Sequence, residues 1–386
     1  MRSWAQPNPA STARLSPPAE VESVVIGGGI AGLSTALYLA RAGRDVLVLD
    51  RGDPWGESSG ANAGTVVLFV LPPAVLPMTF RALALWPALG AEAGGQSLFQ
   101  RSGGLCIAMS PEEDRALRSW FETQKAHGVV ADFLEGAALR DFAPWLGPGV
   151  SSAAHCAEDG FVSPLQAGPA MIGLVQDAGI RLLPHTPVTG IGPAGAGWRI
   201  TTPTGELRCR DIAIAAGAWS GQVSALCGVG LRVFVDVNML AATEPAPPVL
   251  DRVVTHIGGS LSLKQFDNGT CLIGGGWQGK GSLRAATRAV HGENLLQNLA
   301  FAARAVPALC DTRLTRAWAG YEGVAADSLP LFGPLPGRAG IFVAACARGG
   351  FLLGPALGYH LAELMTEGRC SLPIAAYGPA RAAQTA

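Results

Sequence analysis

The sequence lacks a strong charge of either sign, and it lacks runs of basic residues. Its 28 lysines and arginines nearly balance 29 acids, which gives a formal net charge of −1. Nucleic acids and anionic membrane surfaces are bound through basic patches, usually interleaved with aromatic side chains. We therefore expect no nucleic-acid partner for this chain.

Closely paired cysteines are also absent. None of the eight, Cys106, Cys156, Cys209, Cys227, Cys271, Cys310, Cys346 and Cys370, stands at C-x-x-C spacing. Zinc and iron–sulfur sites favour such pairs, so we predict no metal in this chain. Residues 1–20 hold four prolines and no apolar signal-peptide core, and no stretch approaches the length needed to span a bilayer. These absences predict a flexible leader, a cytoplasmic protein and buried free thiols.

What the sequence does contain is a strand–helix–strand unit with a glycine-rich first turn. Val24 to Ile26 predicts a buried strand, and the apolar residues from Ile30 to Arg41 recur at helical spacing. Val46 to Leu49 predicts the second strand. Such a βαβ unit opens many nucleotide-binding domains.

Three glycines and one acid fit this unit for dinucleotide binding. Gly27 permits the turn, Gly29 lets the backbone approach a pyrophosphate, and Gly32 lets helix and strand pack closely. The pyrophosphate would face the helix N-terminus. Asp50, which ends the second strand, can accept hydrogen bonds from both hydroxyls of an adenosine ribose. A glycine triplet alone also occurs in ordinary βα turns, but here all parts of the unit agree.

The residues after Asp50 are small and polar, and they predict an extended loop that runs into a strand. Ser58, Ser59, Asn62 and the backbone of Ala63 and Gly64 could approach a planar ring closely. A solvated loop is the alternative.

Two later strands also end in glycine. Asp211 to Ala215 runs into Gly217, and Ile341 to Ala345 is followed by Arg348-Gly349-Gly350 and a long helix. This repetition indicates a nucleotide domain assembled from separated pieces.

Between these two strands the pattern is antiparallel. The turn Asp267-Asn268-Gly269 predicts a hairpin. Lys264 falls in the middle of its first strand, where a lysine usually faces solvent and less often serves an active site.

The chain from about Val24 to Met365 resembles the glycine oxidase and D-amino-acid oxidase superfamily of FAD-dependent amine oxidoreductases. The resemblance is carried by VVIGGGIAGLSTALYLARAGRDVLVLD, SSGANAGTV, IAIAAGAWS, RAWAGYEGVAADSLPLFG and GIFVAACARGGFLLGPALGYHLAELM. Within the superfamily, SGANAG and LSLKQFDNGTCLIGGGW are most similar to β subunits of multi-subunit opine oxidases and hydroxyproline dehydrogenases.

This resemblance implies an α/β fold with a discontinuous Rossmann-like FAD-binding domain and an α+β substrate domain that contains a large antiparallel sheet. The implied ranges are a leader at 1–20, an FAD-binding domain at 21–95, 148–227 and 316–376, a substrate or cap domain at 96–147 and 228–315, and a tail at 377–386.

The resemblance also implies FAD, with hydride transfer from the carbon next to an amine nitrogen to the flavin, followed by hydrolysis of the imine. The implied cofactor-binding residues are Gly27, Gly29, Ile30, Ala31, Gly32, Asp50, Arg51, Ser58, Ser59, Asn62, Ala63, Gly64, Val188, Gly217, Trp219, Arg348, Gly349, Gly350, Phe351 and Leu352. The candidate catalytic residues are Lys264, Tyr321, Glu322 and Arg348. Covalent attachment of the flavin to a cysteine stays open, because no local feature singles one out.

One position departs from the superfamily. Amino-acid oxidases of this group commonly carry Ala-Gly-Leu-Arg-Pro in the late strand, where the arginine binds the substrate carboxylate, whereas this chain has Glu322 at the arginine position. An acid cannot pair with a carboxylate. Either Arg348 or Lys264 replaces the arginine, or Glu322 receives a cationic part of the substrate, or Glu322 faces solvent or fixes a turn. The substitution favours a secondary amine such as an opine or imino acid.

The electron acceptor is a second open point. Oxidases of the sarcosine type place a lysine over the flavin to activate oxygen, and Lys280 is the candidate here, in a glycine-rich segment typical of a surface loop. We therefore favour a dehydrogenase that passes electrons to iron–sulfur or flavin-bearing partner subunits. The alternatives are a free-standing, peroxide-forming oxidase and a subunit that holds FAD only as an electron relay.

Overall fold

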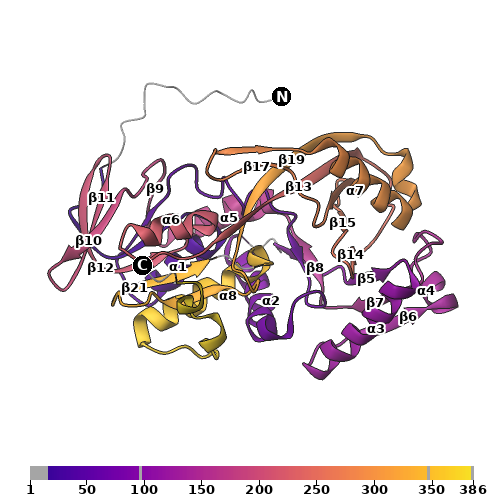
Figure 1. The fold of residues 1–386 in the computed structure, drawn as a ribbon, viewed down its shortest axis with the longest axis horizontal. Coiled ribbons are helices and arrows are strands. Elements are labelled where there is room, and N and C mark those ends of the chain that lie inside the picture. Colours follow the sequence, from indigo (N-terminus) through magenta and orange to yellow (C-terminus); the bar gives the residue numbers. More distant parts are fainter. Residues whose placement is uncertain (1–15, 95–97, 346–347, 384–386) are drawn as a thin grey trace.

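The computed structural model describes residues 16–94, 98–345 and 348–383, which form two large sheets that lie beside each other along the long axis (Figure 1). The N-terminal leader and the end of the tail fall largely outside these residues, as does Cys346. Of the other seven cysteines, which are free thiols, five are buried, Cys370 is half-buried and Cys310 is exposed.

The first sheet contains the glycine-rich unit. Its central strands β12, β1, β2 and β9 are parallel, and β21 joins the second half of β12 in parallel. The antiparallel strands β10, β11 and β20 complete it. The bounds are β1 Glu20–Ile26, β2 Val46–Leu49, β9 Arg181–Leu183, β10 Gly190–Ala194, β11 Gly197–Thr202, β12 Gly205–Ile214, β20 Leu331–Pro334 and β21 Ile341–Ala345.

The two faces of this sheet bury different clusters because side chains alternate along each strand. Val25 faces a helical layer, whereas Val24 and Ile26 face the other cluster, which includes side chains of α6 (Ser220–Ala225). The helical layer consists of α1 Ile30–Arg41, α2 Leu76–Glu92, α5 Pro164–Asp177 and α8 Gly350–Glu367.

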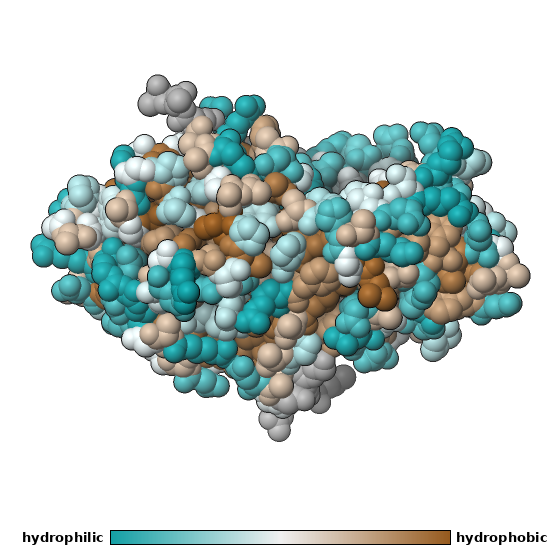
Figure 2. All heavy atoms as spheres, turned by 90° about the horizontal axis from the view of Figure 1, so that it is seen from below, coloured by the Kyte–Doolittle hydropathy of each residue, from teal (hydrophilic) through white to brown (hydrophobic). Residues whose placement is uncertain are grey.

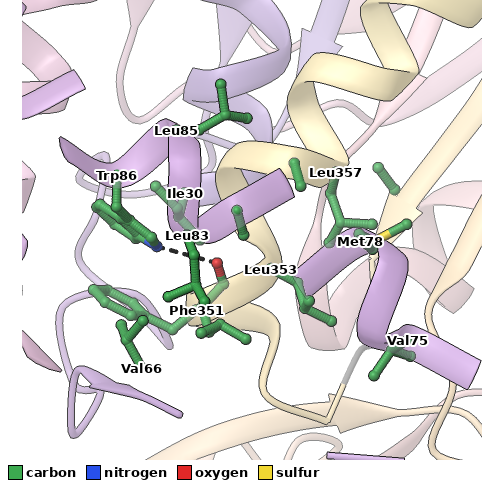
Figure 3. Close-up of a cluster of buried hydrophobic side chains, with 14 of the residues drawn as sticks. Ile30, Val66, Val75, Met78, Leu83, Leu85, Trp86, Phe351, Leu353 and Leu357 are labelled. Atoms are coloured by element: carbon green, nitrogen blue, oxygen red, sulfur yellow. Dashed lines mark hydrogen bonds between the residues drawn. The ribbon is translucent and has the colours of Figure 1, made fainter. Parts of the chain in front are cut away.

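A tryptophan of α2 fixes the start of α8 (Figure 3). The Trp86 ring stacks on Phe351 with 5.3 Å between centroids, and its Nε1 donates to the Leu352 carbonyl oxygen at 3.1 Å. Trp86 is fully buried. This packing holds the N-terminus of α8 at the edge of the cavity described below.

The helix α2 corrects one expectation from the sequence. Pro73–Glu92 has the length and mean hydropathy, 1.3, of a membrane span, so the expectation that no stretch approaches that length is wrong. However, 56% of its 18-residue apolar window is buried, and α2 packs mainly against α8. Buried core helices share this length and composition. Figure 2 views the molecule from the side of α2 and α8, where apolar atoms interrupt a mostly hydrophilic surface. We therefore take α2 as a core helix.

The second sheet has the order β19-β13-β16-β15-β14-β5-β7-β6 and is mostly antiparallel. The helices α4 (Gly136–Phe142) and α7 (Gly292–Ala305) cover one of its faces, and α3 (Pro111–Ala126) packs on β5 and β7. The bounds of the strands are β5 Gly104–Ala108, β6 Asp132–Glu135, β7 Ser152–Cys156, β13 Phe234–Pro245, β14 Val253–His256, β15 Ser262–Gln265, β16 Thr270–Gly274 and β19 Leu314–Val324.

Shorter elements join these layers. Two small sheets are formed by β3 (Thr65–Val66), β4 (Phe99–Gln100) and β8 (Gly160–Val162), and by the hairpin of β17 (Lys280–Ser282) and β18 (Thr287–Ala289).

The local predictions are largely confirmed. The first strand–helix–strand unit has the expected elements, and the turn at Asp267 to Gly269 joins β15 to β16. The predicted strand Asp211 to Ala215 is instead the second half of β12, because that strand continues from its hairpin with β11 into parallel pairing with β21. The strands β7 and β19 pair in the second sheet, although the predicted ranges of the first domain contain β7 and most of β19. The domain boundaries stay a prediction.

Candidate functional site

A cavity of about 1590 Å³ lies where the two sheets meet. We call its wall around Gly27, Gly29, Asp50 and Gly217 the glycine end, and its wall around Asp236, Glu322 and Arg348 the acid end. Of the predicted site residues, those that line the cavity are Gly27, Gly29, Ile30, Ala31, Asp50, Arg51, Ser58, Ser59, Asn62, Ala63, Val188, Gly217, Trp219, Tyr321, Glu322, Arg348, Gly349, Gly350, Phe351 and Leu352. Gly32, Gly64 and Lys264 do not.

Gly32 does not line the cavity, but it allows α1 to pack closely against the turn at Gly27. A Cβ atom on Gly32 would lie 1.8 Å from the Gly27 carbonyl oxygen, so α1 and β1 approach as closely as the motif predicts. Gly27 has φ +113°, and its Cβ would lie 2.4 Å from the Ala215 carbonyl oxygen. Side chains at either position would push the turn apart, and the cradle for a pyrophosphate would be lost.

Polar groups at the start of α1 fit a phosphate-bearing ligand. Ser59 Oγ accepts a hydrogen bond from the Ile30 N–H at 2.9 Å and lies beside Gly29, which has no side chain to cap the helix. The helix N-terminus therefore faces the cavity with small groups only, and its dipole favours an anion.

Asp50 stands at the end of β2 as predicted. Its Oδ2 accepts from the Gly28 N–H at 2.6 Å and its Oδ1 from the Gly52 N–H at 2.8 Å. Burial raises the pKa of this carboxyl above its ordinary value, although both N–H groups oppose the shift. The backbone thus fixes the carboxylate on the cavity wall, where each oxygen keeps lone pairs for a ribose hydroxyl.

The acid end is an ion cluster that joins three distant segments. Arg348 Nη1 lies 2.7 Å from Glu322 Oε2, and its Nη2 lies 2.7 Å from Asp236 Oδ2. Asp236 and Glu322 are paired across β13 and β19. Two carboxylates and one guanidinium leave one surplus negative charge, so the acid end attracts cations rather than carboxylates.

Amide side chains extend this cluster. Asn238 Nδ2 donates to Glu322 Oε2, and Gln278 Nε2 donates to Asn238 Oδ1. Burial is the main cause that raises the pKa of Glu322 above its ordinary value, and the nearby Arg348 opposes it. Burial alone would lower the pKa of Arg348, but the carboxylates of Glu322 and Asp236 outweigh it and raise that pKa. The guanidinium therefore stays charged and engaged by both acids.

Tyr321 lies next to Glu322 but faces away from the cluster, because neighbouring residues of a strand point to opposite faces. Its hydroxyl donates to the carbonyl oxygens of Thr287, at 2.8 Å, and Ser282, at 3.2 Å. The structure therefore does not bring this hydroxyl together with Glu322 and Arg348.

Lys264 is fully buried, and the expectation that it faces solvent is wrong. Its strand β15 packs one face against α7, and the other face is covered by the loop of the first sheet rather than by water. Its Nζ donates to the Ala63 carbonyl oxygen at 2.6 Å and to Thr65 Oγ1 at 2.5 Å. Burial without a carboxylate partner lowers the pKa of Lys264 to about 7.

Hydrogen-bonded hydroxyl groups connect Lys264 to the wall of the cavity. Thr65 Oγ1 lies 2.7 Å from Ser262 Oγ, and both residues line the cavity. Lys280, which lies in a segment whose sequence is typical of a surface loop, is exposed on β17 and does not line the cavity.

Several residues of this site could not be found from the sequence. Asp236 and Asn238 stand two apart in a mostly apolar strand, and this alternation could have marked a polar face. Their contact with Glu322 depends on the strand register, for which the sequence has no local signal. The same holds for Thr65 and Ser262, which come from separate sheets.

Comparison with known proteins agrees with this geometry. The family described as "DAO: FAD dependent oxidoreductase" matches residues 22–364. A Pseudomonas aeruginosa protein named as subunit HcnC of hydrogen cyanide synthase is 30% identical to this chain. The alignment covers 93% of this chain and 95% of that protein. A protein of Agrobacterium tumefaciens named as one of the opine oxidase subunits is 27% identical over 86% of this chain and 89% of that protein.

A solved structure has a similar fold. The crystal structure of L-proline dehydrogenase from P. horikoshii superposes with a TM-score of 0.86 at 26% identity, over 95% of this chain and 98% of that one. This match confirms the predicted combination of a Rossmann-like domain with a substrate domain. The family match confirms FAD as the cofactor, and the glycine end has the shape and donors that FAD requires.

Proposed function

This chain belongs to the DAO family of FAD-dependent oxidoreductases, and from that premise we propose that it oxidises the C–N bond of a secondary amine or amino acid, such as an opine or hydroxyproline. We propose further that it works in the cytoplasm as the catalytic subunit of a multi-subunit dehydrogenase. The observation that carries the proposal is the continuous cavity, which joins a dinucleotide cradle to a negatively charged substrate wall.

Bound FAD would take a hydride from the carbon next to the amine nitrogen, and water would hydrolyse the resulting imine. The protein has to hold FAD at the glycine end and orient the amine at the acid end. Apolar side chains of the wall, among them Val67, Val70 and Leu240, limit the water near the reacting carbon.

The acid end favours one of the interpretations left open by the sequence. Arg348 already binds two carboxylates, and Lys264 does not line the cavity, so neither is available to a substrate carboxylate. Glu322 lines the cavity, and the cluster of Asp236, Glu322 and Arg348 carries one more negative than positive charge. We therefore propose that Glu322, together with Asp236, receives a cationic part of the substrate.

Two relatives support a role within a complex. The names of the Pseudomonas aeruginosa and Agrobacterium tumefaciens proteins describe them as subunits, and both align along most of this chain. Because the cysteines of this chain lack metal-binding spacing, an iron–sulfur centre would have to come from a partner.

One observation favours a second candidate, a peroxide-forming oxidase. The preference for a dehydrogenase rested partly on the surface setting of Lys280, but Lys264 is a buried lysine behind the loop predicted to contact the flavin. A charged lysine in that place would stabilise negative charge that develops on oxygen.

Anaerobic flavin reduction tests the proposal. The purified protein, with and without co-purifying partners, is mixed with opines, hydroxyprolines, sarcosine and D-amino acids while the flavin absorbance is recorded. We expect bleaching by a secondary amine that carries a further cationic group. Bleaching only by simple D-amino acids would contradict the role of Glu322, and no bleaching would favour the relay alternative. Peroxide formation in air by the isolated chain would favour the oxidase.

A further inference from the structure

The hairpin of β17 and β18 extends from the second sheet over the glycine end of the cavity. Lys280 pairs with Ala289 and Ser282 pairs with Thr287. The turn between the strands places Leu283 and Arg284 on the cavity wall. These two side chains are therefore contributed by the second sheet to the wall of the cavity.

Contacts on both sides hold the hairpin in this position. Tyr321 binds the carbonyl oxygens of Ser282 and Thr287, which fixes the strands to β19. Leu283 packs in a cluster with Ala218, Val237 and Tyr321. Since Ala218 directly follows Gly217, the hairpin touches the turn that is predicted to lie beside the pyrophosphate.

An ion cluster ties the hairpin to the loop after β2. Arg288 of β18 pairs with Glu57, and Glu57 also pairs with Arg51 at 2.8 Å. Arg51 stacks on the ring of Trp219 at 3.7 Å. One carboxylate against two guanidiniums leaves a positive surplus beside Ser58 and Ser59.

Arg284 adds a further positive charge. It is exposed and lines the cavity, and within residues 16–94, 98–345 and 348–383 it has no hydrogen-bond or ion-pair partner. The other acids of this wall are engaged elsewhere: Asp50 accepts from two backbone N–H groups, and Asp53 lies 2.9 Å from His185. A guanidinium without a partner on a cavity wall is suited to bind an anion of the ligand.

We propose that the hairpin is a clasp for FAD, in which Arg284 binds the diphosphate and Leu283 holds the turn against the glycine end. The clasp rests on FAD as the cofactor and not on the proposed substrate. Val237 and Tyr321, on which the hairpin packs, face away from Asp236 and Glu322 across the β13–β19 pair. The two strands thus separate the hairpin from the acid end, and the diphosphate is the anion within its reach.

Release of FAD from the holoenzyme tests the clasp. Free FAD fluoresces more strongly than bound FAD, so dilution of the purified protein reports the release rate without any substrate. Arg284→Gln should raise this rate about tenfold, the effect of one charge-assisted hydrogen bond. The difference from the unchanged protein should shrink in high salt. Lys280→Gln removes a cation from the same hairpin that does not line the cavity, and should leave the rate unchanged.

A second variant separates charge from packing. Leu283→Ala should also speed release, because the turn loses its packing on Ala218, but the salt dependence should remain. The proposal is overturned if Arg284→Gln and Lys280→Gln release FAD at the same rate. It is equally overturned if the effect of Arg284→Gln is independent of salt, since the residue would then act through hairpin structure and not through the phosphate charge.

Discussion

The two ends of the cavity use different parts of the polypeptide to recognise a ligand. The glycine end works mainly through backbone: the turn at Gly27, the N-terminus of α1 and the N–H groups that fix Asp50. The acid end works through side chains of β13, β19 and the segment before α8. A backbone site is suited to a constant cofactor, whereas a side-chain site can change its charge by single substitutions. By its resemblance to amino-acid oxidases that carry a carboxylate-binding arginine at this position, we expect Glu322 to be such a change.

The largest expected effect comes from breaking the glycine end. Gly32→Ala places a Cβ atom 1.8 Å from the Gly27 carbonyl oxygen, so α1 and β1 must separate. We expect the variant to be purified almost without FAD, as measured by flavin absorbance relative to protein absorbance. Gly192→Ala is the matched control, because no atom lies within 4 Å of the added Cβ. A normal flavin content in Gly32→Ala would refute the proposed role of this turn.

The next largest effect is expected from a change at the acid end that leaves FAD binding intact. Glu322→Gln removes the surplus negative charge while it preserves the shape of the side chain. We expect the concentration of the best amine needed for half-maximal anaerobic flavin reduction to rise about tenfold. The FAD content should not change. Glu112→Gln, on the exposed start of α3, serves as the control. Equal amine dependence in both variants would mean that Glu322 does not contact the substrate.

The third prediction concerns Lys264, which is buried and does not line the cavity. In the folded protein its pKa is lowered to about 7 from its ordinary value of 10.5, so from pH 7 to 10.5 the unfolded chain binds more protons. The free energy of unfolding should therefore rise with pH across this window, and the cost of the buried charge should be greatest below pH 7. Lys264→Met removes this cost.

The measurement is the melting temperature of Lys264→Met minus that of the unchanged protein, recorded against pH. The difference should be largest in favour of the variant below pH 7 and should decline toward pH 10.5. Lys280→Met should show no such trend, because Lys280 is exposed. A difference that does not vary with pH would contradict a neutral lysine in the folded state.

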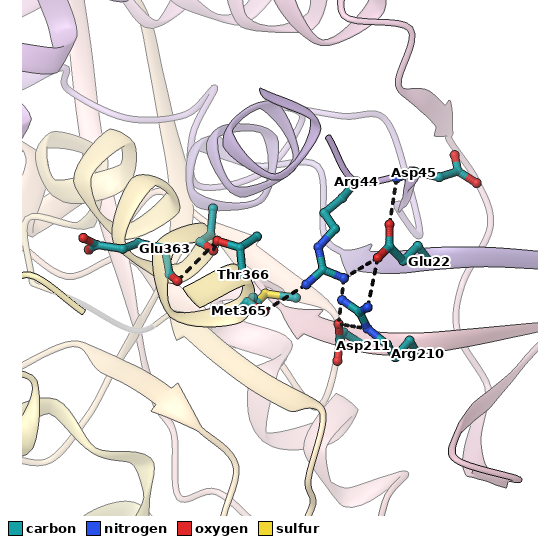
Figure 4. Close-up of polar contacts among 9 residues, drawn as sticks. Glu22, Arg44, Asp45, Arg210, Asp211, Glu363, Met365 and Thr366 are labelled. Atoms are coloured by element: carbon teal, nitrogen blue, oxygen red, sulfur yellow. Dashed lines mark hydrogen bonds and ion pairs between the residues drawn. The ribbon is translucent and has the colours of Figure 1, made fainter. Parts of the chain in front are cut away.

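The smallest effect on the cavity is expected from a cluster near the start of β1, at the end of the strand opposite to Gly27. There Arg44 pairs with Glu22 and Asp211, and its Nη2 donates to the Met365 carbonyl oxygen at 3.2 Å (Figure 4). Arg44→Met should lower the melting temperature by about 2 to 4 °C and leave FAD release unchanged. Faster release in this variant would show that the cavity depends on distant packing more than its local contacts indicate.

The sequence predicted the glycine end well because its signals are local. Strand, glycines, helix and Asp50 follow one another within a single βαβ unit, and each has a steric or electrostatic reason to be there. The acid end could be predicted only in part. Glu322 stood out against the superfamily pattern, but its partner Asp236 is set by the pairing of β13 with β19.

Burial explains the remaining error. A lysine in a strand normally faces water, and the sequence does not reveal that a loop of the other sheet covers β15. Lys264 was therefore expected to face solvent. Contacts between segments far apart in the chain decided its position, whereas the surface setting expected for Lys280 follows from its local glycine-rich sequence.

A crystal structure of the holoenzyme with a bound, non-reducing amine tests the central claim most directly. We predict the FAD diphosphate at the N-terminus of α1, the flavin ring along residues 58–64, and the amine nitrogen within hydrogen-bond distance of Glu322. A flavin ring bound elsewhere, or an amine held away from Asp236 and Glu322, would contradict that claim.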